Sequence, residues 1–473
     1  MQFSSRRRWL MQTACGFGAL ASGEMLTRAA SAATIPQPHF VPKAKRIIFL
    51  FMQGGVSHVD SFDYKPLLAK HDGQMMPFDD DRVLAKSGER GSIHRVMTSP
   101  WKFRQYGHTG RWVSDLFPEM AQHVDDMCMA HSMHTEGVAH GPSTLFLHCG
   151  SANFVRPSFG SWVSYGLGSE NEDLPAFVSI APSIGNGGPR NFGSAFLPAR
   201  FQGTAIGSAS TESSDLSIEN LTTGGGPAMR SMAEQRRQLD FIQSLNREQL
   251  ARRGQDDHEL EAVLESYELG WRMQTVAPDV FDIGRETAAT RSAYGLDEAA
   301  TRGFGEKCLL ARRLCESGVR FVQVTYGDNS ANPAWDQHSN LPKHAEHARA
   351  VDRPIAALLA DLKQRGLLED TLIWWGGEFG RTPYSEKNGT GRDHNPSGFT
   401  VWLAGGGVAA GRTVGETDEF GHRAIRQKIH MHDLHATLLH LMGIDHERLT
   451  YQYAGRNFRL TDVHGRVVKE LIA

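Results

Sequence analysis

The apolar residues of this chain form short continuous runs, separated by segments in which they recur with helical spacing. The clearest run covers residues 46–52 and stops at Gln53-Gly54-Gly55. A continuous apolar run that ends in glycines is typical of a central parallel strand followed by a tight loop. Further strands of this kind are predicted at residues 174–181, 319–326, 371–375 and 399–403, and residues 126–151 read as a strand, a polar loop and a short helix.

Other segments show the period of a helix. Leu260, Val263, Leu264, Tyr267 and Trp271 share one helical face, and we expect a mainly helical insertion at about residues 229–310. Amphipathic helices are also predicted ahead of Gly366 and over residues 431–445. Residues 70–110 look loop-heavy, and residues 202–228 read as a Gly/Ser/Thr-rich surface loop.

This alternation of helices and strands sets the expected fold class. Strands that alternate with helices over such a length form a mostly parallel sheet with helices on both faces. We therefore predict one three-layer α/β/α domain over residues 33–473, in which the helical segment is an insertion.

The N-terminus carries the features of an export signal. Ser5-Arg6-Arg7-Arg8-Trp9-Leu10 is close to a twin-arginine motif, a weakly apolar stretch follows, and Ala30-Ser31-Ala32 is a small-residue cleavage site. We expect residues 1–32 to be a signal peptide that the twin-arginine translocase recognises. The mature protein is then periplasmic or extracellular.

Composition narrows the function classes. The formal charge of −3 becomes −6 once residues 1–32, with four Arg and one Glu, are removed. The mature chain thus lacks the basic field that a nucleic-acid partner requires. After cleavage no run of 18 apolar residues remains, so no membrane span is expected. The five cysteines show no CxxC spacing, which argues against zinc ribbons and thioredoxin-type chemistry.

Polar residues follow several of the predicted strands. Asp336 and His338 come after the strand at 319–326, Glu378 and Arg381 after the strand at 371–375, and His394 shortly before the strand at 399–403. Ligands of open α/β sheets bind at the carboxyl ends of the strands. Carboxylates and imidazoles gathered there suit a divalent cation such as zinc or manganese.

Five motifs, taken in order, resemble a known family. They are "GGVSHVDSFDYKP", "WDQHSN", "EFGRTP", "GRDHNPSGFTVWLAGGG" and "HDLHATLLHLMGID". Together they resemble the DUF1501 family, which is similar in fold to the alkaline phosphatase and sulfatase superfamily. The resemblance covers nearly all of the mature chain. It implies an alkaline-phosphatase-like fold and a divalent metal ion (zinc, manganese or calcium) held by Asp336, His338, Glu378 and His394.

The resemblance also implies a nucleophile in a loop before a helix. The comparable loop here is "TEGVAHGPST", which offers His140, Ser143 or Thr144, and Arg381 is the candidate that holds an anion. The chain departs from the superfamily at two expected metal ligands, where it has Gln53 and Phe379. A two-metal site is therefore incomplete, and one metal is the most that these residues supply.

Two functions fit these residues. The first is an exported metallohydrolase of phosphate or sulfate esters, which acts on an anionic small molecule or a polysaccharide. The second is a catalytically degenerate relative that binds a periplasmic ligand or partner without turnover. Structural roles also stay open: Asp336 as a helix cap, and Arg381 as a surface partner of Glu378.

The export motif gives the first testable prediction. Replacing Arg6 and Arg7 together by Lys is expected to leave the precursor in the cytoplasm, because the twin-arginine translocase reads the arginine pair. Cell fractionation followed by immunoblotting measures this, with the same double substitution at Arg28 and Arg46 as the control. Mature protein that still reaches the periplasm would contradict the assignment.

Overall fold

The computed structural model describes residues 37–210, 231–253, 258–386 and 389–473. The predicted signal peptide and residues 211–228 of the predicted surface loop lie outside these ranges. Pro38–Ala473 form one compact unit. Among the described residues, no helix is long and apolar enough to cross a membrane.

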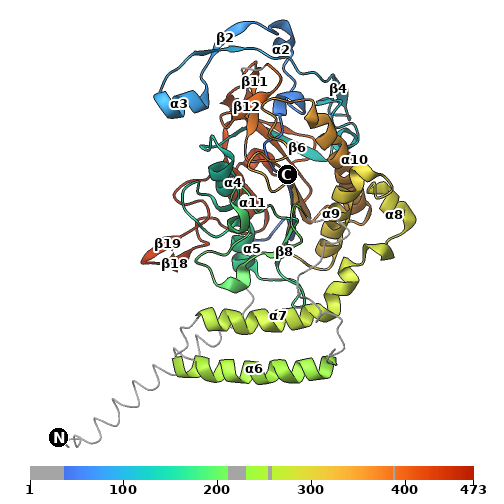
Figure 1. The fold of residues 1–473 in the computed structure, drawn as a ribbon, viewed down its shortest axis with the longest axis vertical. Coiled ribbons are helices and arrows are strands. Elements are labelled where there is room, and N and C mark those ends of the chain that lie inside the picture. Colours follow the sequence, from blue (N-terminus) through green and yellow to red (C-terminus); the bar gives the residue numbers. More distant parts are fainter. Residues whose placement is uncertain (1–36, 211–230, 254–257, 387–388) are drawn as a thin grey trace, which may run out of the picture. The chain divides into compact units, whose positions relative to one another are not determined.

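A nine-stranded sheet lies at the centre of this unit (Figure 1). Its strands are β1 (Arg46–Met52), β6 (Met127–His134), β7 (Phe177–Ile180), β8 (Thr204–Ile206), β9 (Phe321–Tyr326), β10 (Thr371–Gly376), β13 (Phe399–Ala404), β14 (Thr413–Val414) and β17 (Ile429–His430). They are ordered β14-β6-β13-β10-β1-β9-β7-β8, and β17 also pairs with β6.

Most neighbouring strands run parallel. β1 lies between β9 and β10 and pairs in parallel with both, so that Ile48 is opposite Val322 on one side and Ile373 on the other. β13 runs antiparallel to β10 and to β6. The carboxyl ends of β9, β1 and β10 therefore meet at one edge of the sheet, where the loops that follow them come together.

Alternate residues of β1 pack on opposite faces of the sheet. Ile48, Leu50 and Met52 join the core under α9 (Ala299–Glu316) and α10 (Lys343–Gln364). Phe49 and Phe51 join a second core under α4 (His140–Cys149), α5 (Phe159–Leu167) and α11 (Met431–Leu441). Helices thus cover both faces, as Figure 1 shows. The expected three-layer α/β/α class with a mostly parallel sheet is confirmed.

The helical segment ends earlier than expected. It contains a hairpin of two long helices, α6 (Met232–Arg253) and α7 (His258–Phe281), followed by the short α8 (Ala288–Ala293). α9 begins at Ala299 and packs against β9 and α10, so it belongs to the core. The helical period continues from one helix to the next, which is why the sequence does not show where the insertion ends.

Residues 70–110 are more regular than expected. They contain α3 (Asp81–Ser87) and most of two β-hairpins, β2 (Met75–Phe78) with β3 (Ser92–Arg95), and β4 (Phe103–Tyr106) with β5 (Arg111–Ser114). These strands are half-exposed, so they lack the apolar alternation that identifies a strand. The remaining helices and strands are α2 (Pro66–Lys70), β11 (Gly380–Ser385), β12 (Arg392–Asn395), β15 (Glu416–Thr417), β16 (Ala424–Arg426), β18 (Tyr451–Tyr453) and β19 (Arg456–Phe458).

An aromatic stack between β1 and β10 gives a stability prediction. Trp374 is buried and stacks on Phe49 with 3.7 Å between the ring centroids. Trp374→Ala should lower the free energy of unfolding by about 3–5 kcal/mol, because it leaves a cavity in the core. Denaturant unfolding measures the change, with Trp112→Ala as the control, since Trp112 is 41% exposed. Equal losses in the two variants would contradict the prediction.

Candidate metal centre

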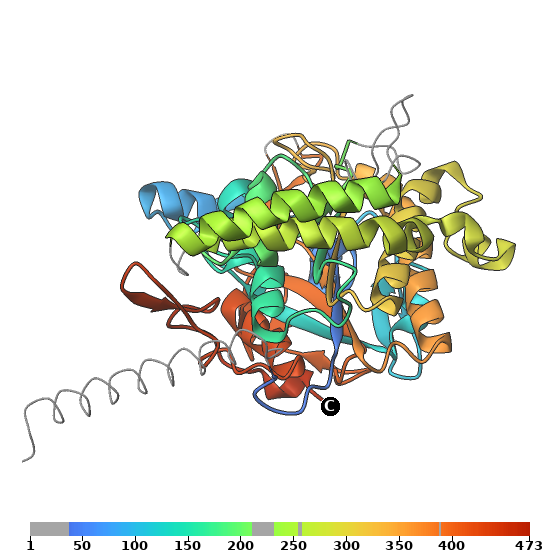
Figure 2. The same ribbon diagram turned by 90° about the horizontal axis from the view of Figure 1, so that it is seen from below.

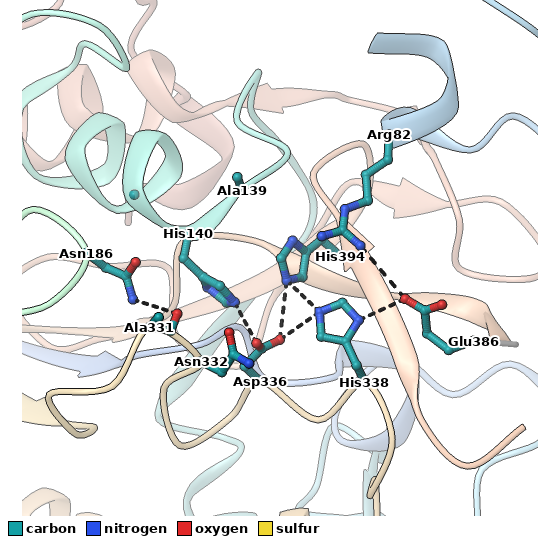
Figure 3. A pocket seen from close by; sticks show the side chains of 11 residues that line it. Arg82, Ala139, His140, Asn186, Ala331, Asn332, Asp336, His338, Glu386 and His394 are labelled. Carbon is teal, nitrogen blue, oxygen red and sulfur yellow. Dashed lines mark hydrogen bonds and ion pairs between the residues drawn. The ribbon is translucent and has the colours of Figure 1, made fainter. Parts of the chain in front are cut away.

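The carboxylate of Asp336 is the meeting point of the polar cluster at the sheet edge (Figure 3). Its Oδ1 lies 2.8 Å from Arg381 Nη2, 3.0 Å from His338 Nε2 and 3.3 Å from His394 Nε2. Its Oδ2 lies 3.1 Å from His140 Nε2. One buried carboxylate thus faces a guanidinium group and three imidazole rings.

The second nitrogen of each imidazole ring is held by an oxygen atom. Nδ1 of His140 lies 2.7 Å from Glu378 Oε1, Nδ1 of His338 lies 2.9 Å from Glu386 Oε1, and Nδ1 of His394 lies 2.9 Å from the carbonyl oxygen of Val138. When the proton of a neutral ring is on Nδ1, the lone pair on Nε2 can bind a metal ion, and when Nε2 carries a proton it donates to Asp336 instead. All three Nε2 atoms are therefore oriented toward Asp336 as potential metal ligands.

Electrostatics keeps the carboxylate charged. Burial by itself raises the pKa of Asp336, but hydrogen bonds from three imidazoles and the charge of Arg381 hold it far below its usual range. Burial lowers the pKa of His394 to about 3, so this ring is neutral at pH 7. Burial also acts to lower the pKa of His140, but its hydrogen bonds to Asp336 and Glu378 outweigh that effect and raise it.

Glu378 lies two residues after the end of β10, and its side chain is fully buried behind His140. The backbone N–H of Gly54 donates to both of its carboxylate oxygens, at 3.0 and 3.1 Å. Gly54 has a φ of +111°, and a Cβ there would lie 2.8 Å from the backbone nitrogen of Asp336. The glycine therefore lets the β1 turn bind Glu378 and pack tightly against the Asp336 loop.

Arg381 is fully buried, so it does not hold an anion in the pocket as the resemblance implied. Its Nη2 donates to Asp336, its Nε donates to the carbonyl oxygen of Gly55 at 3.0 Å, and its Nη1 to that of Arg392 at 3.2 Å. The alternative surface pair with Glu378 does not form either. β11 carries Arg381 beneath the loops because its guanidinium compensates the buried charge of Asp336.

Arg392, the other arginine at this edge, is also buried. Its Nε and Nη2 donate to the two carboxylate oxygens of Asp60 at 2.7 and 3.0 Å, and both side chains are inaccessible to solvent. Asp336 does not act as a helix cap, since the N-cap of α10 is Pro342. Both arginines and Asp336 thus belong to one buried ionic framework.

A cavity of about 700 Å³ opens above this framework. Its lining residues come from α3, the start of α4, β12 and the loops at the sheet edge: Arg82, Ala139, His140, Gly141, Asn186, Ala331, Asn332, Asp336, His338, Glu386 and His394. The structure thus brings Asp336, His338 and His394 together in one pocket, and joins Glu378 to them through His140.

Two of the candidate nucleophiles do not reach the cavity. Ser143 and Thr144 lie on α4, both buried, and the Ser143 hydroxyl donates to the carbonyl oxygen of Ala139 at 2.7 Å. Of the three candidates from that loop, His140 alone lines the cavity, because it is the first residue of α4. The helix turns the two hydroxyls away from the pocket and into the protein.

The donor set can be tested against metal geometry. His338 Nε2, His394 Nε2 and Asp336 Oδ1 form a triangle with sides of 3.0, 3.0 and 3.3 Å. Ligands of a tetrahedral ion with bonds of 2.0–2.1 Å lie about 3.3 Å apart, so small shifts admit a zinc-sized ion. Manganese also accepts such nitrogen and oxygen ligands. Calcium, with its six to eight oxygen ligands, does not fit a set rich in imidazole.

More than one ion position is compatible with these residues. The ligand atoms of His140, Asp336 and His394 lie within 4.8 Å of one another, and so do those of His338, Asp393 and His394. His394 is common to both groups. Because the two groups of ligands share the His394 ring, they favour a single ion that takes ligands from both groups.

Several site residues had no signal in the sequence. Glu386 orients His338, and Arg82 contributes a cation from α3, yet neither follows a strand of the central sheet. A charged residue in a surface segment is ordinarily just solvated, so only the fold identifies these two. Phe379, at an expected ligand position, stacks on the His394 ring with 4.2 Å between centroids and excludes a ligand there.

Comparison with known proteins places the chain in a family. It belongs to the family described as "Protein of unknown function (DUF1501)", which matches residues 44–472. A comparison with curated proteins found no match.

Three solved structures illustrate what the chain is similar to. Lipoteichoic acid synthase LtaP from Listeria monocytogenes is 8% identical, with 89% of this chain and 76% of that chain covered and a TM-score of 0.37. Alkaline phosphatase from the Antarctic bacterium TAB5 is 12% identical, with 85% and 98% covered and a TM-score of 0.34. PsFucS1 sulfatase from Pseudoalteromonas sp. is 13% identical, with 91% and 72% covered and a TM-score of 0.35.

These proteins include an alkaline phosphatase and a sulfatase, the two classes that the sequence motifs resemble.

The buried ion pair yields a prediction about stability. Arg381→Met should lower the free energy of unfolding by about 3–5 kcal/mol, because it leaves the Asp336 carboxylate buried without its counterion. Adding Asp336→Asn should restore part of the loss, since the uncompensated charge is then gone. Denaturant unfolding at pH 7 measures the free energy of unfolding of both variants. The control is Arg82→Met, which should lower that free energy by less than about 1 kcal/mol because Arg82 is half-exposed.

The pH dependence follows from the direction of the pKa shift. The pKa of Asp336 is lowered by folding, so its contribution to stability is present above its unfolded pKa of about 4 and is lost as the pH falls below it. The cost of Arg381→Met should therefore shrink in acid. If the losses in the free energy of unfolding caused by Arg381→Met and Asp336→Asn simply add, and the loss caused by Arg381→Met does not change with pH, the two side chains are not coupled.

Proposed function

We propose that this chain is an exported, metal-dependent hydrolase of phosphate or sulfate esters. The observation that carries the proposal is the orientation of His140, His338 and His394. Each ring is fixed through Nδ1, and each directs Nε2 at the carboxylate of Asp336 inside one open cavity. Three imidazole nitrogens grouped with one carboxylate oxygen are a ligand set that suits a divalent ion.

The residues that would hold the ion are Asp336, His338 and His394, and His140 lies next to them. A divalent ion bound there supplies a Lewis acid that stabilises negative charge on the ester. Glu386 and the Val138 carbonyl fix the ligand rings from behind. Such supporting contacts commonly change metal affinity by 10- to 100-fold.

The cavity favours direct attack by water. Among its lining residues there is no serine, threonine or cysteine, and the hydroxyls of Ser143 and Thr144 are buried elsewhere. The ester would thus be hydrolysed without transfer to a hydroxyl of the chain. His140, whose pKa is raised, is the group beside Asp336 that carries a proton most readily.

Arg82 replaces Arg381 as the residue that would contact an anion. It reaches into the cavity from α3, with Nη1 2.8 Å from Asp393 and 3.8 Å from Glu386, and its side chain is 45% exposed (Figure 3). Asn186 and Asn332 add amide groups to the wall, and the apolar lining is limited to small residues. This wall suits a polar substrate, either an anionic small molecule or a polysaccharide.

The second candidate function is a binding protein without turnover. Gln53 is fully buried at the end of β1, and Phe379 is packed on His394. Neither residue therefore provides a ligand for a second metal ion at this edge. A site with one ion could then retain a ligand and leave it intact. Binding of metal without hydrolysis distinguishes this function from the first.

A ligand substitution tests the proposal. His338→Ala is expected to weaken zinc or manganese binding by at least 100-fold, because it removes one donor of three. Hydrolysis of model phosphate and sulfate esters should fall in parallel. Calorimetric titration and a release assay measure the two effects, with His108→Ala, at an exposed histidine outside the pocket, as the matched control.

The two readouts separate the alternatives. If wild-type protein binds zinc or manganese at micromolar or lower concentration and hydrolyses neither ester class, the binding function replaces the enzyme. If it binds neither ion, or if His338→Ala and His108→Ala bind alike, the metal centre itself is refuted.

A further inference from the structure

Arg82 and His338 contact the same two carboxylate oxygens at the wall of the cavity. Arg82 Nη1 lies 2.8 Å from Asp393 Oδ1 and 3.8 Å from Glu386 Oε1. His338 Nδ1 lies 2.9 Å from Glu386 Oε1 and 3.7 Å from Asp393 Oδ1. Figure 3 shows Glu386 between Arg82 and His338. Each of the two oxygens is therefore shared by a guanidinium group and an imidazole ring.

His338 and Asp393 are held in place by other contacts. His338 Nε2 lies 3.0 Å from Asp336 Oδ1 and 3.0 Å from His394 Nε2. Asp393 is buried, and its Oδ1 also accepts from the backbone N–H of His394 at 2.7 Å. The ring and this carboxylate thus have fixed positions at the metal centre.

Arg82 is the most exposed member of the group. Its side chain is 45% exposed, against 28% for Glu386, 26% for His338 and 11% for Asp393. It lies on α3, a helix without a buried residue, and Figures 1 and 2 show α3, in blue, at the outer edge of the protein. Within the described residues its guanidinium donates one hydrogen bond, to Asp393. The remaining N–H groups can bind an anion in the cavity.

Glu386 and Asp393 support His338 as a metal ligand. A metal-binding histidine commonly donates its other N–H to a carboxylate, which raises the basicity of the ring. Arg82 opposes this support, because its positive charge attracts the same carboxylate oxygens. An anion bound to Arg82 would offset that charge and leave both carboxylates to His338. Anion binding and metal binding should then favour each other, and such coupling is reciprocal.

We propose that Arg82 couples anion binding to metal binding through Glu386 and Asp393. The inference rests on the proposed function, since it needs a metal ion at His338 and an anionic group in the cavity. Without an anion, Arg82 weakens the affinity of the site for its ion. With a phosphate or sulfate group bound to Arg82, that effect is lost, and the site holds its ion most tightly when substrate is present.

The metal affinity of Arg82→Met protein tests the proposal without an assay of hydrolysis. Zinc and, in a separate series, manganese are titrated calorimetrically into metal-free protein, in sodium chloride and in sodium sulfate of equal ionic strength. In chloride, Arg82→Met should bind metal about five- to tenfold more tightly than the wild type. Sulfate should tighten wild-type binding by a similar factor, and that of Arg82→Met by less than about twofold.

Arg200→Met is the matched control. The Arg200 side chain is 40% exposed and pairs with Glu265 at 3.2 Å, outside the cavity. Its removal also takes away one half-exposed, paired arginine, so a change in net charge alone would affect both variants. Arg200→Met should bind metal like the wild type, with and without sulfate.

Glu386→Gln with Asp393→Asn tests the route of the coupling. This double variant is expected to bind metal about 10- to 100-fold more weakly, because His338 loses its charged support. Adding Arg82→Met to it should not tighten metal binding, since no charged carboxylate remains for Arg82 to attract. A direct repulsion between Arg82 and the ion would give the same gain in both backgrounds. Circular dichroism checks the fold of each variant.

Two results would overturn the proposal and leave the metal centre intact. One is an Arg82→Met protein with wild-type metal affinity. The other is sulfate that affects the wild type and Arg82→Met equally, which would exclude Arg82 as the link. A wild type that binds neither zinc nor manganese would refute the metal centre and the coupling together. Coupling in a protein that hydrolyses neither ester class would support the proposal and replace the hydrolase by the binding function.

Discussion

The buried carboxylate of Asp336 is the constraint on which the sheet edge depends. A carboxylate removed from water needs charged and hydrogen-bonding partners, and this one has a guanidinium and three imidazoles around it. The partners come from four separate segments: α4, the loop after Asp336, β11 and β12. These segments must therefore fold together, because none of them satisfies the charge alone.

The sheet brings these segments together by ordinary topology. Parallel strands β9, β1 and β10 end at the same edge, so the loops that follow them are neighbours before any side chain is considered. Gly54 then brings the β1 turn against the Asp336 loop and binds Glu378, which holds His140. Arg381 balances the charge from below, while the imidazoles leave Asp336 open to the cavity on the other side.

The sequence predicted the fold class and much of this edge, because buried strands and their polar ends leave a short-range pattern. Asp336, His338 and His394 could be grouped on that basis. The burial of Arg381 could not, since its partner lies 45 residues away and either a rim or a core position fits the local sequence. Arg82 enters from α3, a segment without apolar periodicity. Only the three-dimensional structure brings it to the cavity.

The central claim is that these imidazoles and Asp336 hold a metal ion, and anomalous scattering tests it most directly. Crystals equilibrated with zinc or manganese should show one anomalous peak at bonding distance, about 2.0–2.2 Å, from His338 Nε2, His394 Nε2 and Asp336 Oδ1. An Asp336→Asn crystal treated in the same way should lose most of that peak. Wild-type crystals at saturating metal with no peak in the cavity, or with peaks only at surface histidines, would contradict the account.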